Sequence, residues 1–405
     1  MQDWPEWGRS MDGSREWKEY LQEQALLHPA LQPQDVAKFC YQAAYGAEHM
    51  LSDLESARKY LEAEYEEVQA CEGPLWEGIH DRLCRVNLGA WKWHGMPLEW
   101  LFRMFAQAVG KVFPADSADD GAPDTPLCGQ EAIVGGQRPD ARPGSREDAF
   151  WEGIKAAESL LAEGGFGFDR ESFVSYFDAY RKQYAKPVPV HHSAVYREKE
   201  KPSYRLVDRE LTRILPILES LCQGGGTGRN GSEMAERGVQ VVAIDGRCAS
   251  GKSTMARQLC AITGAGLVHM DDFFLPKELR TLGRLQEPGG NVHNERFLQE
   301  VLPQLGRGEA FSYRRFHCGR MELGESRLVP AGRIRVVEGA YSCHPLFGSY
   351  MDLRVFSDVS PKEQLARIAR RDGGDALEAF RTRWIPMEER YFKAFGIRDR
   401  ASLLV

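Results

Sequence analysis

The stretch from Val239 to Gln258, VQVVAIDGRCASGKSTMARQ, constrains the fold of this 405-residue chain more than any other. It opens with an uncharged, β-branched run that is typical of a strand buried on both faces of a parallel sheet. The following residues match the pattern G-x-x-x-x-G-K-[ST], which occurs once in the chain, and a good helix-forming sequence comes next. A strand, a glycine-rich loop and a helix in this order predict a P-loop.

This loop is suited to bind phosphate groups. Its glycines let backbone N–H groups surround phosphate oxygens, and the helix that follows adds the positive end of its dipole. We expect Lys252 to reach the β- and γ-phosphates of a nucleotide and the Ser253 hydroxyl to bind Mg²⁺. The predicted nucleotide-binding residues are Gly246, Arg247, Cys248, Ala249, Ser250, Gly251, Lys252, Ser253 and Thr254.

Composition narrows the classes of partner. The formal net charge is -7 and no basic stripe stands out, so nucleic acid is not an expected partner. No apolar run has the length of a membrane span, and the acidic, aromatic start of the chain does not resemble a signal peptide. The nine cysteines lack paired spacing, which together with the nucleotide motif indicates reduced thiols and a cytoplasmic location.

The remaining chain divides into two expected domains, 1–222 and 239–405. Residues 1–222 are predicted to be mainly helical, with helices over 34–50, 52–68, 81–93, 98–109, 149–161, 171–184 and 206–221, the last interrupted by Pro216. Residues 113–148 and 223–238 lack an apolar period and are rich in small and turn-forming residues, which predicts a flexible insertion and a linker. Acceptor binding, formation of a homo-oligomer and recognition of another protein stay open as roles for the helical domain.

Acidic residues follow two further strands of the C-terminal domain. Asp271 and Asp272 come after a short apolar run at 267–270, and Glu338 follows another at 334–337. In an open α/β sheet, ligands bind outside the carboxyl ends of the strands. We therefore expect Lys252, Ser253, one of the two aspartates and Glu338 to converge on a single cleft. Such a site combines a phosphate clamp, a metal site and a general base.

An arginine-rich helix is predicted after a fourth strand, at 353–356. Ser360, Pro361 and Glu363 form a helix start, and Arg367 and Arg371 follow on one face. Closely spaced guanidinium groups after a late strand suit a lid that closes over phosphates. The alternative is a solvated surface helix.

Several motifs together resemble a known family. IDGRCASGKST, HMDDFF, EPGGNVHNERF, VVEGAYS, RIARRD and WIPMEERYF resemble, in this order, the uridine kinase and phosphoribulokinase group of P-loop kinases, over about residues 239–395. The resemblance implies an α/β fold with a P-loop NTPase-type parallel sheet, preceded here by the mainly helical domain. It also implies ATP-dependent phosphorylation of a hydroxyl on a small molecule, with Mg²⁺ as cofactor.

The resemblance also assigns roles to single residues. Asp271 takes the place of the base that accepts the hydroxyl proton, and Glu338 matches the acidic residue near Mg²⁺. The implied metal residues are Ser253, Asp271 and Glu338, and the implied catalytic residues are Asp271, Lys252, Arg367 and Arg371.

The acceptor is less well defined by the resemblance. His293, Tyr313 and His317 lie where such kinases build their acceptor pocket, but His293 stands where relatives often carry an aspartate that holds sugar hydroxyls. A nucleoside, a sugar phosphate and a vitamin precursor are alternative acceptors. A different class of function is a nucleotide-dependent regulator, in which ATP binding switches the N-terminal module.

Overall fold

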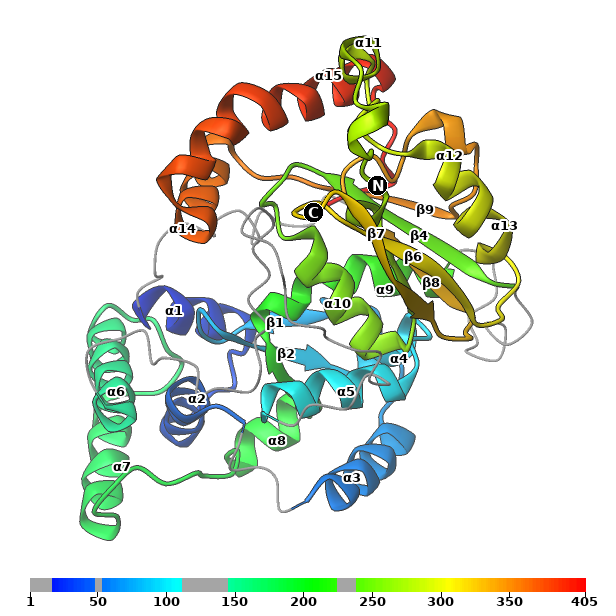
Figure 1. Cartoon of the computed structure of the whole chain (residues 1–405). Coiled ribbons are helices and arrows are strands. Elements are labelled where there is room, and N and C mark those ends of the chain that lie inside the picture. The colour runs from blue at the N-terminus through cyan, green and yellow to red at the C-terminus, as the bar shows by residue number, and fades with distance from the viewer. Residues whose placement is uncertain (1–16, 48–52, 111–144, 224–237) are drawn as a thin grey trace. The chain divides into compact units, whose positions relative to one another are not determined.

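The structure is a computed structural model that describes residues 17–47, 53–110, 145–223 and 238–405 (Figure 1). The described residues form two compact units. The first contains residues up to 93 together with 101–110 and 145–212, and the second contains 94–100 and 213–405. The predicted insertion and linker lie mostly outside the described residues. Residues 146–148, expected in the insertion, form the start of a helix, and Gln223, expected in the linker, is the last residue of another helix.

The N-terminal part of the chain is rich in helices, as predicted. The helices before residue 201 are α1 (Trp17–Leu27), α2 (Pro33–Tyr45), α3 (Leu54–Glu67), α4 (Leu88–Trp93), α5 (Leu98–Ala108), α6 (Arg146–Ala162), α7 (Arg170–Gln183) and α8 (Ala194–Glu200). Short polar residues start several of them: Ser145 accepts the Asp148 N–H at 3.1 Å, and Asp169 accepts the Ser172 N–H at 2.7 Å. These side chains satisfy N–H groups that the first helical turn leaves without partners.

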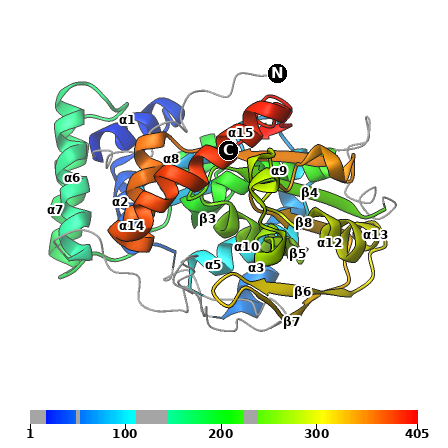
Figure 2. The same ribbon diagram turned by 45° about the horizontal axis from the view of Figure 1, so that its top comes forward.

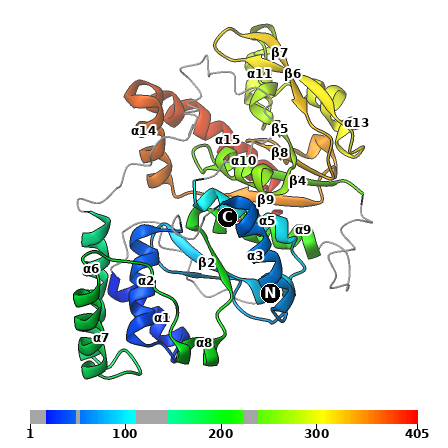
Figure 3. The same ribbon diagram turned by 90° about the horizontal axis from the view of Figure 1, so that it is seen from below.

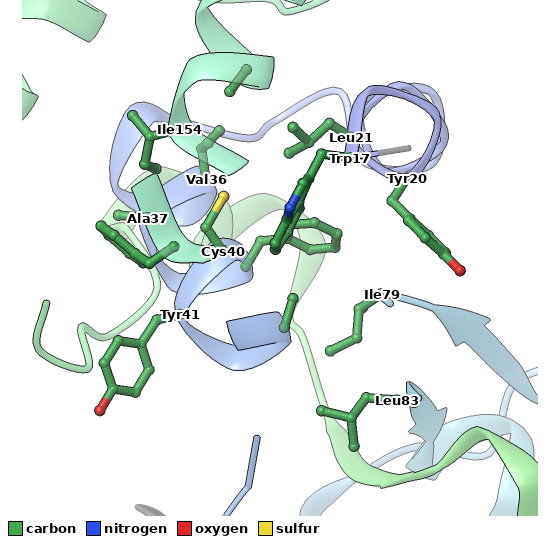
Figure 4. Close-up of a cluster of buried hydrophobic side chains, with 14 of the residues drawn as sticks. Trp17, Tyr20, Leu21, Val36, Ala37, Cys40, Tyr41, Ile79, Leu83 and Ile154 are labelled. Carbon is green, nitrogen blue, oxygen red and sulfur yellow. The ribbon is translucent and has the colours of Figure 1, made fainter. Parts of the chain in front are cut away.

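Aromatic and aliphatic side chains from α1, α2 and α6 form the core of the first unit. Trp17 and Leu21 of α1 face Val36 and Cys40 of α2, with Ile154 of α6 beside them (Figure 4). α6 packs against both α1 and α2, and α7 lies alongside α6 in every view (Figure 3). The high aromatic content of this region is therefore explained in large part by its core.

Two of the predicted helices, 81–93 and 206–221, are wrong where they begin, because 83–87 and 206–208 belong to a sheet and the 3₁₀ segment η2 (Arg209–Ile214) follows the second of these strands. β1 (Trp76–Gly78), β2 (Leu83–Asn87) and β3 (Tyr204–Asp208) pair in that order, both pairs antiparallel. Cys84 lies opposite Val207, so the pairing joins segments more than a hundred residues apart. A short apolar run does not distinguish strand from helix by its period. Pro216 is the second residue of α9 (Leu215–Gln223), where proline starts a helix without kinking it.

The second unit is built on a five-stranded parallel sheet with the order β10-β9-β4-β8-β5. Its strands are β4 (Gln240–Gly246), β5 (Gly266–His269), β8 (Ile334–Glu338), β9 (Leu353–Ser357) and β10 (Leu403–Leu404). The P-loop joins the central strand β4 to α10 (Lys252–Thr263), which packs against β4, β5 and β8 (Figure 1). This arrangement confirms the predicted P-loop NTPase-type α/β fold.

Smaller elements surround this sheet. They are the 3₁₀ segments η4 (Met270–Phe273) and η5 (Lys277–Leu279), α11 (Leu282–Gln286), α12 (Asn294–Arg296), α13 (Leu302–Leu305), and the antiparallel hairpin of β6 (Phe311–His317) and β7 (Glu322–Val329). At the C-terminal end, α14 (Pro361–Ala379), a π-helical turn and α15 (Ile385–Phe395) follow one another (Figure 2). Gly373 interrupts α14 with a φ of 81°. In the described part of the chain, every helix is too short or too polar to cross a membrane.

Candidate active site

Glycine is required where β4 enters the P-loop. Gly246 has a φ of 133°, and a Cβ atom at this position would lie 2.1 Å from the carbonyl oxygen of Ser357 on β9. Gly251 precedes α10 with a φ of 96°. These two conformations, which residues with side chains rarely adopt, turn the chain from the central strand into the helix.

Lys252 lies over the loop that precedes it. Its side chain is buried, and Nζ donates hydrogen bonds to the carbonyl oxygens of Gly246 at 2.8 Å and Arg247 at 2.7 Å. The predicted phosphate-binding ammonium is thus held at the P-loop by two backbone oxygens. A bound phosphate would attract it by charge.

Glu338 connects the P-loop helix to the end of β8. The Ser253 hydroxyl donates to Glu338 Oε2 at 3.1 Å, and His269 Nδ1 lies 2.5 Å from Glu338 Oε1. Burial acts to raise the pKa of Glu338, but the hydrogen bond and charge of His269, with Lys252 and Ser253, lower it below its usual value. Glu338 is therefore held as a carboxylate beside the loop.

Asp271 is the second carboxylate of this group. Burial raises its pKa first, and the negative charge of Glu338 raises it further, while Lys252 and His269 act in the opposite direction. The mutual influence of these charges places Asp271, Glu338 and Lys252 in one electrostatic cluster.

The donor set of this cluster fits a magnesium ion. A serine hydroxyl and carboxylate oxygens are hard ligands, and Mg²⁺ takes one or two carboxylates together with phosphates and water. The described residues contain no group of three or more His, Cys, Asp or Glu side chains placed to hold a metal ion. A site shared with nucleotide phosphates is consistent with this smaller protein contribution.

Asp272 points into the protein, in a different environment from Asp271. It is 4% exposed, accepts the Tyr313 hydroxyl at 2.9 Å, and lies near the guanidinium groups of Arg315 and Arg327 at 3.6 and 3.4 Å. The two aspartates lie on the 3₁₀ turn that follows β5. Successive side chains on such a turn still diverge, since three residues complete the turn.

The two predicted lid arginines of α14 have different partners. Arg367 donates from Nη1 to the Ala249 carbonyl at 3.3 Å and from Nε to Glu363 at 2.8 Å. Arg371 pairs with its neighbour Asp372 at 2.8 Å. Buried Gln364 adds a bond to the Cys248 carbonyl at 3.1 Å. The structure therefore brings Arg367 to the P-loop backbone, whereas the ion pair of Arg371 is with its own neighbour on α14.

Three polar residues around the P-loop are absent from the sequence-based prediction. Fully buried Asp245, on β4, accepts the N–H groups of Gly246 at 2.7 Å and Cys343 at 2.9 Å and the hydroxyl of Tyr391 at 2.8 Å. Glu388 of α15 accepts the Cys248 N–H at 3.0 Å. Arg213 donates to the Ser250 carbonyl at 3.3 Å. Asp245 and Glu388 lie inside the quoted motifs IDGRCASGKST and WIPMEERYF, which was the available signal.

Two of the residues predicted for acceptor binding, Tyr313 and His317, lie on β6, and the third, His293, lies before α12. Tyr313 is 2% exposed, donates to Asp272 and accepts the His269 N–H at 3.1 Å. His317 lies on the β6–β7 hairpin, 2.7 Å from Glu325. His293 precedes α12, with Nε2 at 4.0 Å from Glu295. Tyr313 thus supports Asp272 and the backbone before Asp271, whereas the two histidines lie beside glutamates, Glu325 and Glu295.

Comparisons with known proteins find similarity in solved structures. No family model and no curated protein matches the chain. A possible uridine kinase from Bacillus stearothermophilus is 20% identical with a TM-score of 0.32, covering 42% of this chain and 89% of that one. A protein from Silicibacter sp. TM1040, provisionally described as a fructose transport system kinase, is 23% identical with a TM-score of 0.34, covering 42% and 90%. The parallel sheet and the P-loop give the C-terminal part of the chain a P-loop NTPase-type fold.

Proposed function

We propose that the second unit is an ATP-dependent phosphotransferase that phosphorylates a hydroxyl group of a small molecule. The observation that carries this proposal is the cluster of Lys252, Glu338 and Asp271 at the P-loop. A protein that only binds nucleotide needs the lysine and the metal-side carboxylate. It has no need of a second carboxylate beside them, which a general base would supply.

The reaction transfers the γ-phosphoryl group to the acceptor. The acceptor oxygen forms a bond to the γ-phosphorus, the bond from that phosphorus to the bridging oxygen breaks, and ADP leaves. Asp271 accepts the proton of the hydroxyl as the new bond forms. Lys252 and Arg367 stabilise negative charge on the phosphates, and the P-loop N–H groups orient them.

Magnesium, when bound, neutralises charge on the β- and γ-phosphate oxygens. Ser253 and Glu338 would hold it, because the Ser253 hydroxyl already bonds the Glu338 carboxylate. His269 keeps that carboxylate oriented and ionised.

The test is ADP release from the full chain with ATP, Mg²⁺ and a panel of nucleosides, sugar phosphates and small alcohols. Acceptor-stimulated ADP release and a phosphorylated product support the kinase and identify its acceptor. ATP binding without stimulated turnover by any member of the panel would favour the nucleotide-dependent regulator.

A further inference from the structure

The first unit contains a buried polar cluster that phosphotransfer does not use. We define the Arg85 cluster as Gln24 on α1, Lys38 and Gln42 on α2, Glu77 on β1 and Arg85 on β2. Arg85 is 2% exposed, and the two glutamines are 1% exposed. Polar side chains are seldom buried to this extent unless each of their donors and acceptors is satisfied.

The acceptors of the Arg85 cluster are all used. Arg85 Nη1 donates to Gln24 Oε1 at 2.8 Å and to Glu77 Oε1 at 3.1 Å, and Nη2 donates to Gln42 Oε1 at 2.9 Å. Glu77 Oε2 lies 2.8 Å from His28 Nε2. Tyr204 covers the guanidinium face, with Arg85 Cζ 4.6 Å from the ring centre.

Two buried donors of the cluster are left over. Among the residues that the structure describes, neither Arg85 Nε nor Gln24 Nε2 has a hydrogen-bond partner. An unpartnered buried donor costs about 1–3 kcal/mol. Because the unmet groups are donors and the acceptors are occupied, a ligand that satisfies them has to present acceptor oxygens.

Lys38 adds a positive charge at the edge of this cluster. It precedes Gln42 by one helical turn, so both lie on one face of α2. Its Nζ donates to the Val190 carbonyl at 3.3 Å, and it is half-buried. Burial, and then the charge of Arg85, lower the pKa of Lys38 to about 8. The Glu77 side chain is 18% exposed, so solvent reaches the cluster at this edge too.

We propose that the Arg85 cluster binds a small anion, the carboxylate or phosphate group of a small molecule, through the free N–H groups of Arg85 and Gln24 and the ammonium of Lys38. The site belongs to the first unit and is independent of the proposed phosphotransfer. Fixed guanidinium and amide donors with a nearby ammonium are groups that proteins use to recognise such oxygens.

The test uses acylation of lysines in the full chain near pH 8, read residue by residue by mass spectrometry, with inorganic phosphate or succinate as probe. An anion at about ten times its dissociation constant should slow acylation of Lys38 about tenfold, by the factor 1 + [L]/Kd. Lys59, whose side chain is 71% exposed, should react at an unchanged rate. Protection by only one probe identifies phosphate or carboxylate as the group recognised.

Variants separate this site from the P-loop and from a structural role. Protection of Lys38 should persist in Lys252→Ala and in Gln34→Ala, which changes another glutamine on α2, the helix of Lys38. It should be lost in Gln24→Leu. Unslowed acylation of Lys38 in the wild-type chain with both probes overturns the proposal. So does full protection in a folded Gln24→Leu chain. The wild-type comparison decides the question even where the variant does not fold.

Discussion

At the scale of single residues, the Lys252 ammonium donates to two backbone carbonyls of the P-loop, where phosphate oxygens are expected to bind. Lys252→Ala should lower kcat at least about 10²-fold, as the loss of one transition-state donor does, with an unchanged circular dichroism spectrum. Steady-state ADP release measures the effect, and Lys393→Ala, an exposed lysine of the same unit, is the control. Wild-type turnover in Lys252→Ala would remove the phosphate-binding role.

The paired aspartates should separate chemistry from stability. Asp271→Asn keeps the shape of the side chain but removes the base, so kcat should fall by about 10²–10⁴-fold while ATP still binds. Asp272→Asn removes the negative charge that faces Tyr313, Arg315 and Arg327. We therefore expect a clear fall in the melting temperature and only a small fall in kcat. Thermal melts and turnover assays of both variants measure these effects. If Asp272→Asn alone loses activity, the assignment of the base to Asp271 is reversed.

At the scale of elements, α14 and α15 both contact the P-loop, and each contact has a testable role. Arg367→Ala removes the guanidinium that α14 places on the loop, so kcat should fall more than the affinity for ATP. Arg370→Ala is the matched control, because the Arg370 side chain is 74% exposed and pairs with Glu363 of the same helix. Equal loss of rate and affinity in Arg367→Ala would indicate a static phosphate contact.

Glu388 of α15 places a carboxylate on a backbone donor of the loop that phosphate oxygens are expected to use. Burial raises the pKa of Glu388. Glu388→Gln removes a negative charge next to the phosphate site, so ATP should bind several-fold more tightly, most clearly at low salt. Calorimetric titration measures this, with exposed Glu378→Gln as control. Weaker ATP binding in Glu388→Gln would show that Glu388 instead orders the loop for its ligand.

The elements also show how far the sequence could lead. The P-loop, the strands at its sides and the start of α14 follow from local signals: glycines, short apolar runs, and Ser360, which accepts the Glu363 N–H at 3.3 Å. The strand at 83–87 could not be predicted in this way, because its stability comes from pairing with 204–208. The Glu388 contact was missed for the same reason, since only the folded chain brings α15 to Cys248.

At the scale of the whole molecule, acid should act on the first unit through His192. Burial, with nearby positive charges, lowers its pKa from 6.5 to about 4, although Asp35, at 2.9 Å, opposes this. The folded state then binds fewer protons than the unfolded state between those values, so stability falls as pH drops from 6.5 to 4. The loss is on the order of 3 kcal/mol for a shift of this size.

Urea unfolding at several pH values measures this dependence. His192→Gln should flatten the loss of stability between pH 6.5 and 4, whereas His191→Gln, at the exposed neighbouring position, should leave it unchanged. Glu77, whose pKa falls to about 2 from its usual 4.5, adds a second loss below pH 4.5 in all three chains. An unchanged slope in His192→Gln would contradict the assignment.

The hydrogen bonds from α14 and α15 to the P-loop also determine when, during synthesis, the loop gains its partners. Cys248 is bonded by Gln364 and Glu388, which follow it by 116 and 140 residues. A ribosome makes about 5–20 residues per second, so the loop exists for several seconds before these partners leave the exit tunnel. During that interval, its strand and helix can form, but the loop lacks the side chains that hold it from the other side. The nascent chain therefore completes the surroundings of its P-loop late, after α14 and α15 have been made.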